Sequence, residues 1–290
     1  MRTKKFGVFD AFNLMIMIGM LFVTLYPLYY MFIVSISSGN AVSRGDVIWM
    51  PIDISWQAYK IVFDDPSIMR AYGNTLLYTT LGVGINLAMT SLCAYPLSRK
   101  GFYGRGVCSL LIAFTMFFDG GLIPRFMVVN ELGLVNTMWA LLLPSAINVW
   151  YMILMRTFFQ GIPDTLHESA NIDGAGELRI FLRIVLPLST PIIATMILFY
   201  AVGHWNSFFP ALIYLNDKDL FPLQVILRNI VIQGDMASQG LDMGGIMGSL
   251  VIAQNIKYAV VFVAIAPILA VYPFVQKYFV QGVMVGSVKG

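Results

Sequence analysis

The chain has 290 residues, of which 58% are hydrophobic and only 11% are charged, and its mean hydropathy is +0.77. A soluble globular domain carries about 25% charged residues, so this composition excludes a disordered chain and argues strongly against a soluble enzyme. The net charge of +3, without a cluster of Lys and Arg, argues against a nucleic-acid-binding protein. Two cysteines cannot form a disulfide framework or a four-ligand metal site.

Long stretches of the chain contain no charged residue. A helix rises about 1.5 Å per residue, so about 20 apolar residues cross a bilayer core of about 30 Å. Five charge-free stretches approach or exceed this length, and a sixth reaches it if the helix continues past Asp119. We therefore predict an all-α membrane protein with six transmembrane helices, over residues 12–36, 73–97, 106–128, 137–158, 185–213 and 258–280.

The first apolar stretch follows Arg2, Lys4 and Lys5, which is also the arrangement of a secretory signal peptide. Its apolar run is longer than the 7–15 residues of a signal-peptide core. We interpret it as a membrane anchor.

The distribution of positive charge orients the predicted helices. With the N-terminus in the cytoplasm, more Lys and Arg residues lie on the cytoplasmic side than outside, as the positive-inside rule requires. Six spans then place both termini in the cytoplasm. Residues 37–72 and 214–257 lie outside, and residues 159–184 form a cytoplasmic loop.

The cytoplasmic loop contains signals for one short helix. Pro163 cannot continue a preceding helix, and Thr165 followed by Glu168 is a capping box, so a helix is predicted to start there. Gly174 and Gly176 are predicted to end it after about two and a half turns. A helix this short is not stable alone in water, so it must pack on something. Its position suits docking into a groove of another protein.

The spacing of residues in this loop resembles a known family. Glu168-Ser169-Ala170, three residues, Gly174, nine residues and then Ile184-x-Leu186-Pro187 resemble the EAA loop of ABC importer permeases, with Ser169 in place of the usual alanine. The resemblance extends over about residues 73–290. This part of the chain resembles carbohydrate-type permeases, in particular those for oligosaccharides and polysaccharide fragments. The segments that carry this part of the resemblance are Phe118–Pro124, Leu132–Thr137, Trp205-Asn206 and Gln281–Gly290.

The resemblance implies the type I importer permease (MetI-like) fold, with residues 1–72 as an N-terminal helix and outside loop before a permease core of residues 73–290. It also implies that the loop helix docks in a cleft of a cytoplasmic ATPase subunit and that Leu186-Pro187 begins the fifth span. Two alternatives remain open: Glu168 only caps its own helix, or Gly174 is an ordinary helix C-cap. The predicted coupling residues are Thr165, Glu168, Ser169, Ala170, Asp173, Gly174, Ile184, Leu186 and Pro187.

The source of energy must lie in another chain. The sequence has no G-x-x-x-x-G-K-[ST] phosphate loop, so it cannot hydrolyse ATP by that route. We expect a non-catalytic subunit that binds no cofactor, with ATP and Mg used by a separate ATPase. The resemblance implies a second, usually different permease, two ATPase copies, a solute-binding protein outside and a location in the bacterial cytoplasmic membrane, in contact with its lipids.

Polar groups inside the predicted spans are candidates for a transport path, because such groups are costly in lipid and often functional. Aromatic faces and amide groups suit sugars, so Trp205 beside Asn206 is a candidate pair, with Asn148, Asn86 and His204 as further candidates. The alternatives are an interfacial anchor for the tryptophan, interhelical hydrogen bonds for the asparagines and a packing role for the histidine.

The long outside segment 214–257 is rich in glycine. In related permeases the corresponding loop reaches into the binding protein, and the resemblance implies the same contact here, unless the acidic residues only solvate the loop. The candidate contact residues are Gly234, Asp235, Gly240, Asp242 and Gly244. The tail Gln281–Gly290 is expected to contact the ATPase interface or to be a frayed terminus.

Two other classes of protein compete with this interpretation. A secondary transporter would need intramembrane carboxylates or broken helices that form an ion site. An intramembrane enzyme would need paired Asp, a Ser/His dyad or an HExxH helix, whereas His167 and His204 lie on opposite sides of a span. The predicted substrate is an oligosaccharide, with acidic fragments such as those of alginate or pectin as one possibility and another solute as the alternative.

Overall fold

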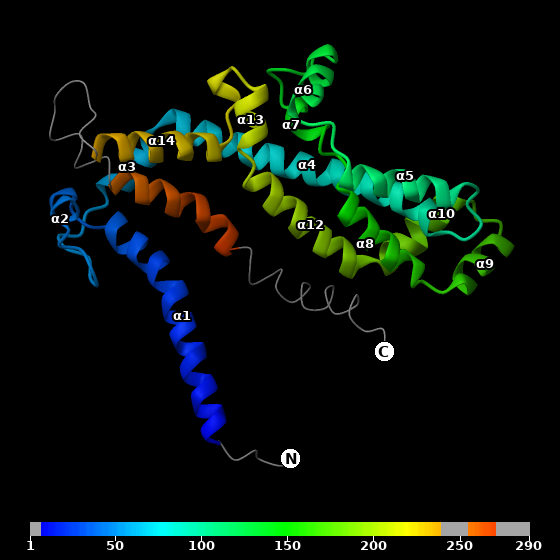
Figure 1. Cartoon of the computed structure of the whole chain (residues 1–290), viewed down its shortest axis with the longest axis horizontal. Helices are drawn as coiled ribbons and strands as arrows, with labels where there is room; N and C mark the ends of the chain where they lie inside the picture. Colours follow the sequence, from blue (N-terminus) through cyan, green and yellow to red (C-terminus); the bar gives the residue numbers. More distant parts are fainter. Residues whose placement is uncertain (1–6, 239–254, 271–290) are drawn as a thin grey trace. The chain divides into compact units, whose positions relative to one another are not determined.

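A computed structural model describes residues 7–238 and 255–270 of the chain (Figure 1). Over these residues the chain is helical and forms no strand, which confirms the all-α prediction. The chain divides into two compact units, Met1–Met69 with Leu227–Pro267 and Arg70–Ile226 with Ile268–Gly290. The division predicted at residue 72 stays a prediction.

The first unit is built around the C-terminal end of a long N-terminal helix. Ile33 and Val34 are buried there together with Ala41 and Val47, whereas residues 7–25 are all exposed. The helices of this unit are α1 (Val8–Ser35), α2 (Gly39–Arg44), α3 (Gln57–Asp64) and a helix over Asn255–Ala270. Apolar side chains exposed along two thirds of a helix are typical of a helix that faces lipid or another subunit.

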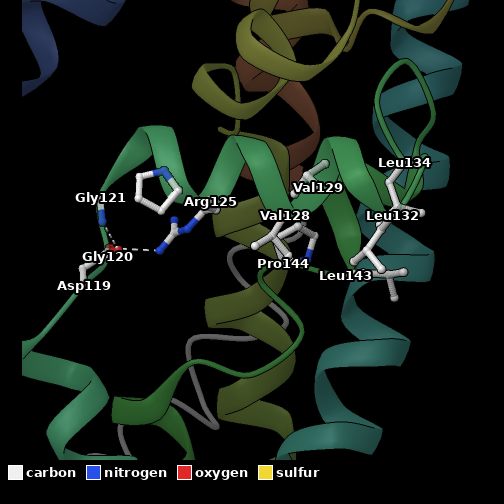
Figure 2. Close-up of a pocket in the computed structure, with 11 residues that line it drawn as sticks. Asp119, Gly120, Gly121, Arg125, Val128, Val129, Leu132, Leu134, Leu143 and Pro144 are labelled. Carbon is white, nitrogen blue, oxygen red and sulfur yellow. Dashed lines mark hydrogen bonds and ion pairs between the residues drawn. The ribbon is translucent and has the colours of Figure 1, made fainter.

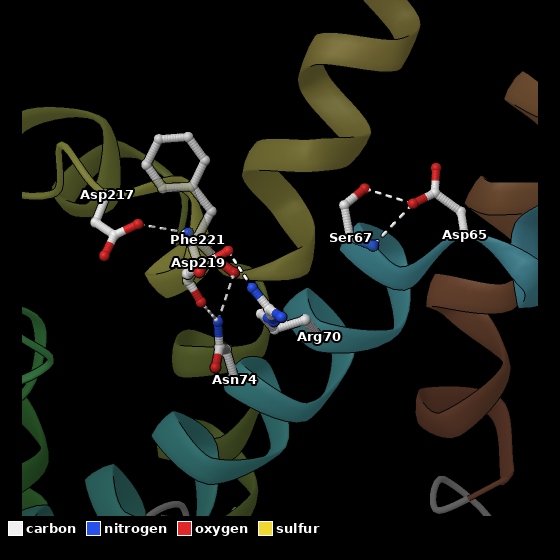
Figure 3. A network of polar contacts seen from close by, with 7 residues as sticks. All are labelled: Asp65, Ser67, Arg70, Asn74, Asp217, Asp219 and Phe221. Atoms are coloured by element: carbon white, nitrogen blue, oxygen red, sulfur yellow. Dashed lines mark hydrogen bonds and ion pairs between the residues drawn. The ribbon is translucent and has the colours of Figure 1, made fainter.

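The second unit has a longer series of helices. They are α4 (Pro66–Ser98), α5 (Arg105–Phe117), α6 (Leu122–Glu131), α7 (Trp139–Leu142), α8 (Val149–Gln160), α9 (Asp164–Ile172), α10 (Glu177–Ile180), the π-helix η1 (Phe181–Val185), α11 (Leu186–Leu188), α12 (Thr190–Trp205), α13 (Phe209–Tyr214), the 3₁₀-helix η2 (Lys218–Leu220) and the first residues of α14 (Leu223–Ser238). The helix α4 begins after Asp65, whose carboxylate accepts a hydrogen bond from the Ser67 backbone N–H (2.8 Å; Figure 3).

One large core holds this unit together. It joins the C-terminal half of α4 to α8, α9, α10 with η1, and α12. Met155, Ile180 and Met196 are fully buried in it. Each such side chain contributes roughly 1.5–3 kcal/mol relative to its exposed state, if the transfer is from water.

Two predicted spans correspond to single helices. Among the described residues, α1 with 28 residues and α4 with 33 are long and apolar enough to cross a membrane, and they match residues 12–36 and 73–97. The sixth predicted span begins within the helix over Asn255–Ala270, and its remaining residues lie outside the described part. The total of six spans and the cytoplasmic location of the termini stay predictions.

Each of the other three predicted spans is divided between two or more helices. Residues 106–128 form α5, which ends at Phe117, and α6, which begins after its N-cap residue Gly121 with a φ of +86, and the two helices meet at 115°. Residues 137–158 are interrupted between α7 and α8, where Pro144 lies. Residues 185–213 contain a bend of 81° between Glu177–Leu188 and Thr190–Trp205.

Candidate functional site

The short helix predicted in the loop is present as α9, but the capping box was wrong. The helix begins at Asp164, with Pro163 as its N-cap residue, so Thr165 lies inside the first turn and cannot cap. The N-cap lies two residues earlier than predicted, and the Asp164 carboxylate in the first turn contacts Lys100 (3.0 Å) and Arg99 (3.5 Å). A carboxylate in the first turn also suits the helix dipole.

The helix ends where the glycine signal predicts. Gly174 has a φ of +74, and its backbone N–H donates to the Asn171 carbonyl (3.0 Å). The Ala175 N–H donates to the Ala170 carbonyl (2.9 Å), which completes a Schellman motif. A Cβ at Gly174 would meet no atom of the described residues within 4 Å, so the positive φ, and not crowding by them, explains the glycine.

One face of α9 is buried in the core of its own unit. His167 and Ala170 are 2% and 8% exposed. The His167 ring stacks on Tyr95 of α4, with 6.3 Å between ring centroids. Packing on the C-terminal end of α4 therefore stabilises α9, which is too short to be stable alone (Figure 1).

The opposite face of α9 is exposed. Thr165, Glu168, Ser169 and Asp173 all lie there. Two apolar side chains accompany them, Leu166 (40% exposed) and Ile172 (87% exposed). We had not predicted these two residues, although an isoleucine among polar neighbours on a short helix is a signal for a docking face.

Burial and neighbouring charge set the titration of groups around α9. Burial, and then the Arg99 charge, lower the pKa of His167, while the Pro163 backbone opposes this shift. A hydrogen bond from Lys100 lowers the pKa of the Asp164 carboxyl. On the far side of the histidine, the Tyr95 hydroxyl donates to Glu177 Oε2 (2.7 Å).

The segment that follows α9 is an interrupted helix. It runs from α10 through the π-helix η1 into α11, and Ile184 and Leu186 pack against the core while Pro187 is exposed. Leu186 and Pro187 lie in α11, before the bend, and α12 begins at Thr190, so the prediction that they begin the fifth span stays a prediction.

The bend has a chemical cause. Pro191 has no N–H to donate to the Pro187 carbonyl, which instead accepts a hydrogen bond from the Thr190 hydroxyl (2.8 Å). Ser189, at the bend, is fully buried. The chain therefore turns sharply between the loop region and α12.

Two of the predicted path residues contact each other. Asn86 of α4 is 1% exposed, and its Nδ2 donates to the Ser145 carbonyl (2.6 Å). Its Oδ1 lies 2.6 Å from Nε2 of His204 on α12. Asn86 thus makes an interhelical hydrogen bond, which was the alternative to a path role for the asparagines, and its partner His204 is held between the two helices.

The other three path candidates differ in exposure. Trp205 is only 6% exposed and meets Tyr72 edge to face, with 5.7 Å between ring centroids. Asn206 is exposed and donates to the Val202 carbonyl (3.0 Å). Asn148 is exposed and caps α8, accepting from the Tyr151 N–H (3.1 Å). Their role in transport stays a prediction.

A cavity of about 460 Å³ lies along α6 (Figure 2), and none of the predicted path residues lines it. Asp119 and Arg125 form an ion pair at its rim (2.9 Å), and Asp119 also accepts from the Gly121 N–H (3.0 Å). Valine, leucine and proline side chains line the rest.

The segment 214–257, expected to be a loop, includes the helix α14, which contains Gly234 and Asp235. The other three predicted binding-protein contacts, Gly240, Asp242 and Gly244, lie outside the described residues, as does the tail Gln281–Gly290.

Residues 75–285 match the family described as "Binding-protein-dependent transport system inner membrane component". The chain belongs to this family, whose members are membrane subunits of transport systems.

Known members cover nearly the whole chain. Protein LplC of Bacillus subtilis (strain 168) is 42% identical over 99% of this chain and 97% of its own length. The polygalacturonan/rhamnogalacturonan transport system permease protein YtcP of the same organism is 44% identical over 91% of this chain and 92% of its own length. A bacterial ABC transporter involved in the import of the acidic polysaccharide alginate includes a chain with a TM-score of 0.87 and 34% identity, covering 96% of this chain and 99% of that one.

Proposed function

We propose that this chain is the permease subunit of an ATP-driven, binding-protein-dependent importer of oligosaccharides or polysaccharide fragments. The observation that carries the proposal is α9: its buried face fixes it to the permease, and its exposed face, with Leu166, Glu168 and Ile172, is free to dock. This face suits the cleft of a cytoplasmic ATPase subunit. The predicted coupling residues supply both the docking face and the connection to α12.

Energy enters through other subunits. The sequence has no phosphate loop, so two separate ATPase copies bind ATP and Mg, and this chain needs no cofactor. Closure of the ATPase pair by ATP moves α9, and the bundle shifts between inward-open and outward-open states because the ATPase pair binds the two states differently. A second homologous permease completes the path, and both termini lie in the cytoplasm.

The substrate class to test first is a fragment of an acidic polysaccharide. One relative is named for polygalacturonan and rhamnogalacturonan, and the similar structure for alginate. Neutral oligosaccharides are the second candidate, since α12 carries no Lys or Arg and other relatives are named for arabinooligosaccharides. On this proposal the transport path lies near Trp205, Asn206, Asn148, Asn86 and His204. The binding protein docks on the outside segment 214–257.

Docking can be tested with a charge-reversed face. In the transporter assembled with its partner subunits, Glu168→Lys combined with Ile172→Glu is expected to lower co-purification of the ATPase at least tenfold. Glu131→Lys, which makes the same replacement as Glu168→Lys at an exposed position on α6, is the control and should leave it unchanged. Equal recovery of the ATPase with both variants would contradict the proposal.

A further inference from the structure

A row of contacts runs along α4 at every fourth residue. Residues four apart lie along one ridge of a helix, so such a row contacts the neighbouring elements one after another along the helix. In this row each member either bonds to or packs against another element of the second unit. Its members are Arg70, Asn74, Tyr78, Gly82, Asn86 and Thr90.

At the N-terminal end of the row, α4 holds the backbone of the segment between α13 and α14 (Figure 3). Nδ2 of Asn74 donates to the carbonyls of Asp219 (2.7 Å) and Phe221 (3.1 Å). The Tyr78 hydroxyl donates to the Leu220 carbonyl (2.9 Å). Three consecutive backbone carbonyls are thus bound by side chains of one helix.

Two further contacts complete this fixing. The Thr75 hydroxyl, which is buried, accepts the Leu223 backbone N–H at 2.8 Å. Arg70 forms an ion pair with Asp219, but both side chains are more than half exposed, so the pair contributes little. The buried hydrogen bond and those to backbone carbonyls are therefore what holds residues 219–223 on α4.

The middle of the row is attached to α12. Gly82 is required there, because a Cβ at this position would lie 2.4 Å from Nε2 of His204. Asn86 bonds to the same histidine (2.6 Å), and the Thr90 hydroxyl bonds to that of Tyr200 (2.7 Å). The two helices are therefore in close contact over more than two turns.

At the C-terminal end, α4 holds the region of α9. Tyr95 donates to Glu177 and stacks on His167, and Arg99 and Lys100 meet Asp164. The same helix therefore contacts both ends of the unit. Its 33 residues span about 50 Å at the usual rise.

The alternative connection from α9 is interrupted. Along the chain, α9 reaches α12 only through the π-helix η1 and the bend of 81° at Ser189. By contrast α4 is one continuous helix whose proline within the helix, Pro96, lies in its last turn. A continuous helix transmits a displacement of one end to the other, whereas a bend absorbs part of it.

We propose that α4 is the element that makes α9 and residues 219–223 respond together, with Thr75 and Tyr95 as the positioning residues at its two ends. This inference rests on the proposed function, in which nucleotide binding to the ATPase moves α9. It assigns the transmission to one helix and to named hydrogen bonds, so removal of a bond at either end must separate the two responses.

Hydrogen exchange on the complete transporter with its ATPase subunits tests the link. Exchange in α9 and in residues 219–223 is measured with and without Mg-ATP and vanadate, and the nucleotide-dependent difference is the readout. The variants are Thr75→Val and Tyr95→Phe, each of which removes one hydroxyl. Thr80→Val is the control, since the Thr80 hydroxyl is exposed and bonds to Leu76 of its own helix.

In the wild type and in Thr80→Val, both regions are expected to respond to nucleotide. In Thr75→Val or Tyr95→Phe, α9 should still respond within about twofold, while the response of residues 219–223 falls at least fivefold. Glu177→Gln, which keeps an acceptor oxygen for Tyr95, should respond as the wild type does. Responses in Thr75→Val and Tyr95→Phe equal to those of Thr80→Val would overturn the link. A wild-type α9 that ignores nucleotide would overturn the proposed function itself.

Discussion

At the residue scale, the clearest requirement concerns the glycine that ends α9. Gly174 adopts a φ of +74, and the two hydrogen bonds of the Schellman motif depend on this conformation. A residue with a Cβ pays about 1–2 kcal/mol in the left-handed region, and asparagine less than most. Because no described residue crowds the position, strain and not a clash governs substitution.

We therefore predict that Gly174→Ala destabilises the docked α9 by about 1–2 kcal/mol, and that Gly174→Asn does so by less. Amide exchange of α9 in the purified transporter measures both. The matched control is Gly176→Ala, because Gly176 has a φ of −72 that alanine adopts readily. Equal effects of alanine at the two positions would contradict the explanation.

His167 predicts a dependence of α9 docking on pH. Around it lie Tyr95 of α4, Arg99 just after the end of α4, Asp164 of α9 itself and Glu177 of α10. Burial and the Arg99 charge lower its pKa below the ordinary 6.5, so the docked state prefers the neutral ring. The undocked state binds the proton more readily, and docking therefore loses free energy as pH falls below about 6.5.

The measurement compares α9 exchange in the wild type with that in His167→Phe at each pH, which cancels the intrinsic effect of pH on exchange. The ratio should be constant above about pH 7 and rise as pH falls below about 6.5. A ratio that stays flat down to pH 5 would show that the histidine does not control docking.

Residue types and spacing predicted much of this site, and the failures have a common origin. Glu168 and Gly174 lie where the loop pattern placed them, on an exposed face and at a helix end. The predicted start of the helix was wrong, and the Asp164 carboxylate in the first turn instead contacts Lys100 and Arg99, which lie 64 and 65 residues away in sequence. A local capping pattern carries no information about such partners.

At the element scale, the π-helix η1 and the bend at Ser189 set the connection between α9 and α12. A π-helix closes each hydrogen bond over one more residue than an α-helix does, and such segments frequently mark functional sites. Leu182 is 52% exposed, so it can be removed with little loss of packing.

We predict that deletion of Leu182 converts η1 to α-helical bonding while the flanking turns stay in register. The thermal stability of the transporter should be unchanged or higher, and ATP-dependent uptake should fall at least tenfold because the π-helical connection is lost. Leu182→Ala, which keeps the chain length, should transport normally. Normal uptake by the deletion variant would show that the π-helix has no mechanical role.

Hydropathy predicted where apolar segments lie but not how they are broken. α1 and α4 correspond well to their predicted spans, whereas α5 and α6 meet at 115°. The composition of a window does not record that Gly121 takes a positive φ or that Pro191 removes a hydrogen bond at the second bend. Breaks depend on single residues, so averages over 20 residues miss them.

At the scale of the whole molecule, the proposed function makes this chain one subunit of a larger transport complex. Its exposed apolar helix α1 needs lipid or another subunit, and its α9 presents a face that the described residues leave exposed. Family membership fixes the class of transport system. The partners and the sugar follow from the proposal, and transport by the assembled complex tests them together.

The most direct measurement is uptake of labelled galacturonate oligosaccharides into vesicles that hold the complete transporter, with its binding protein added outside. We predict uptake that requires internal ATP, persists after the proton and sodium gradients are collapsed, and falls at least tenfold in the combined Glu168→Lys and Ile172→Glu variant. Uptake that an ion gradient drives without ATP, or that this variant leaves intact, would contradict the account.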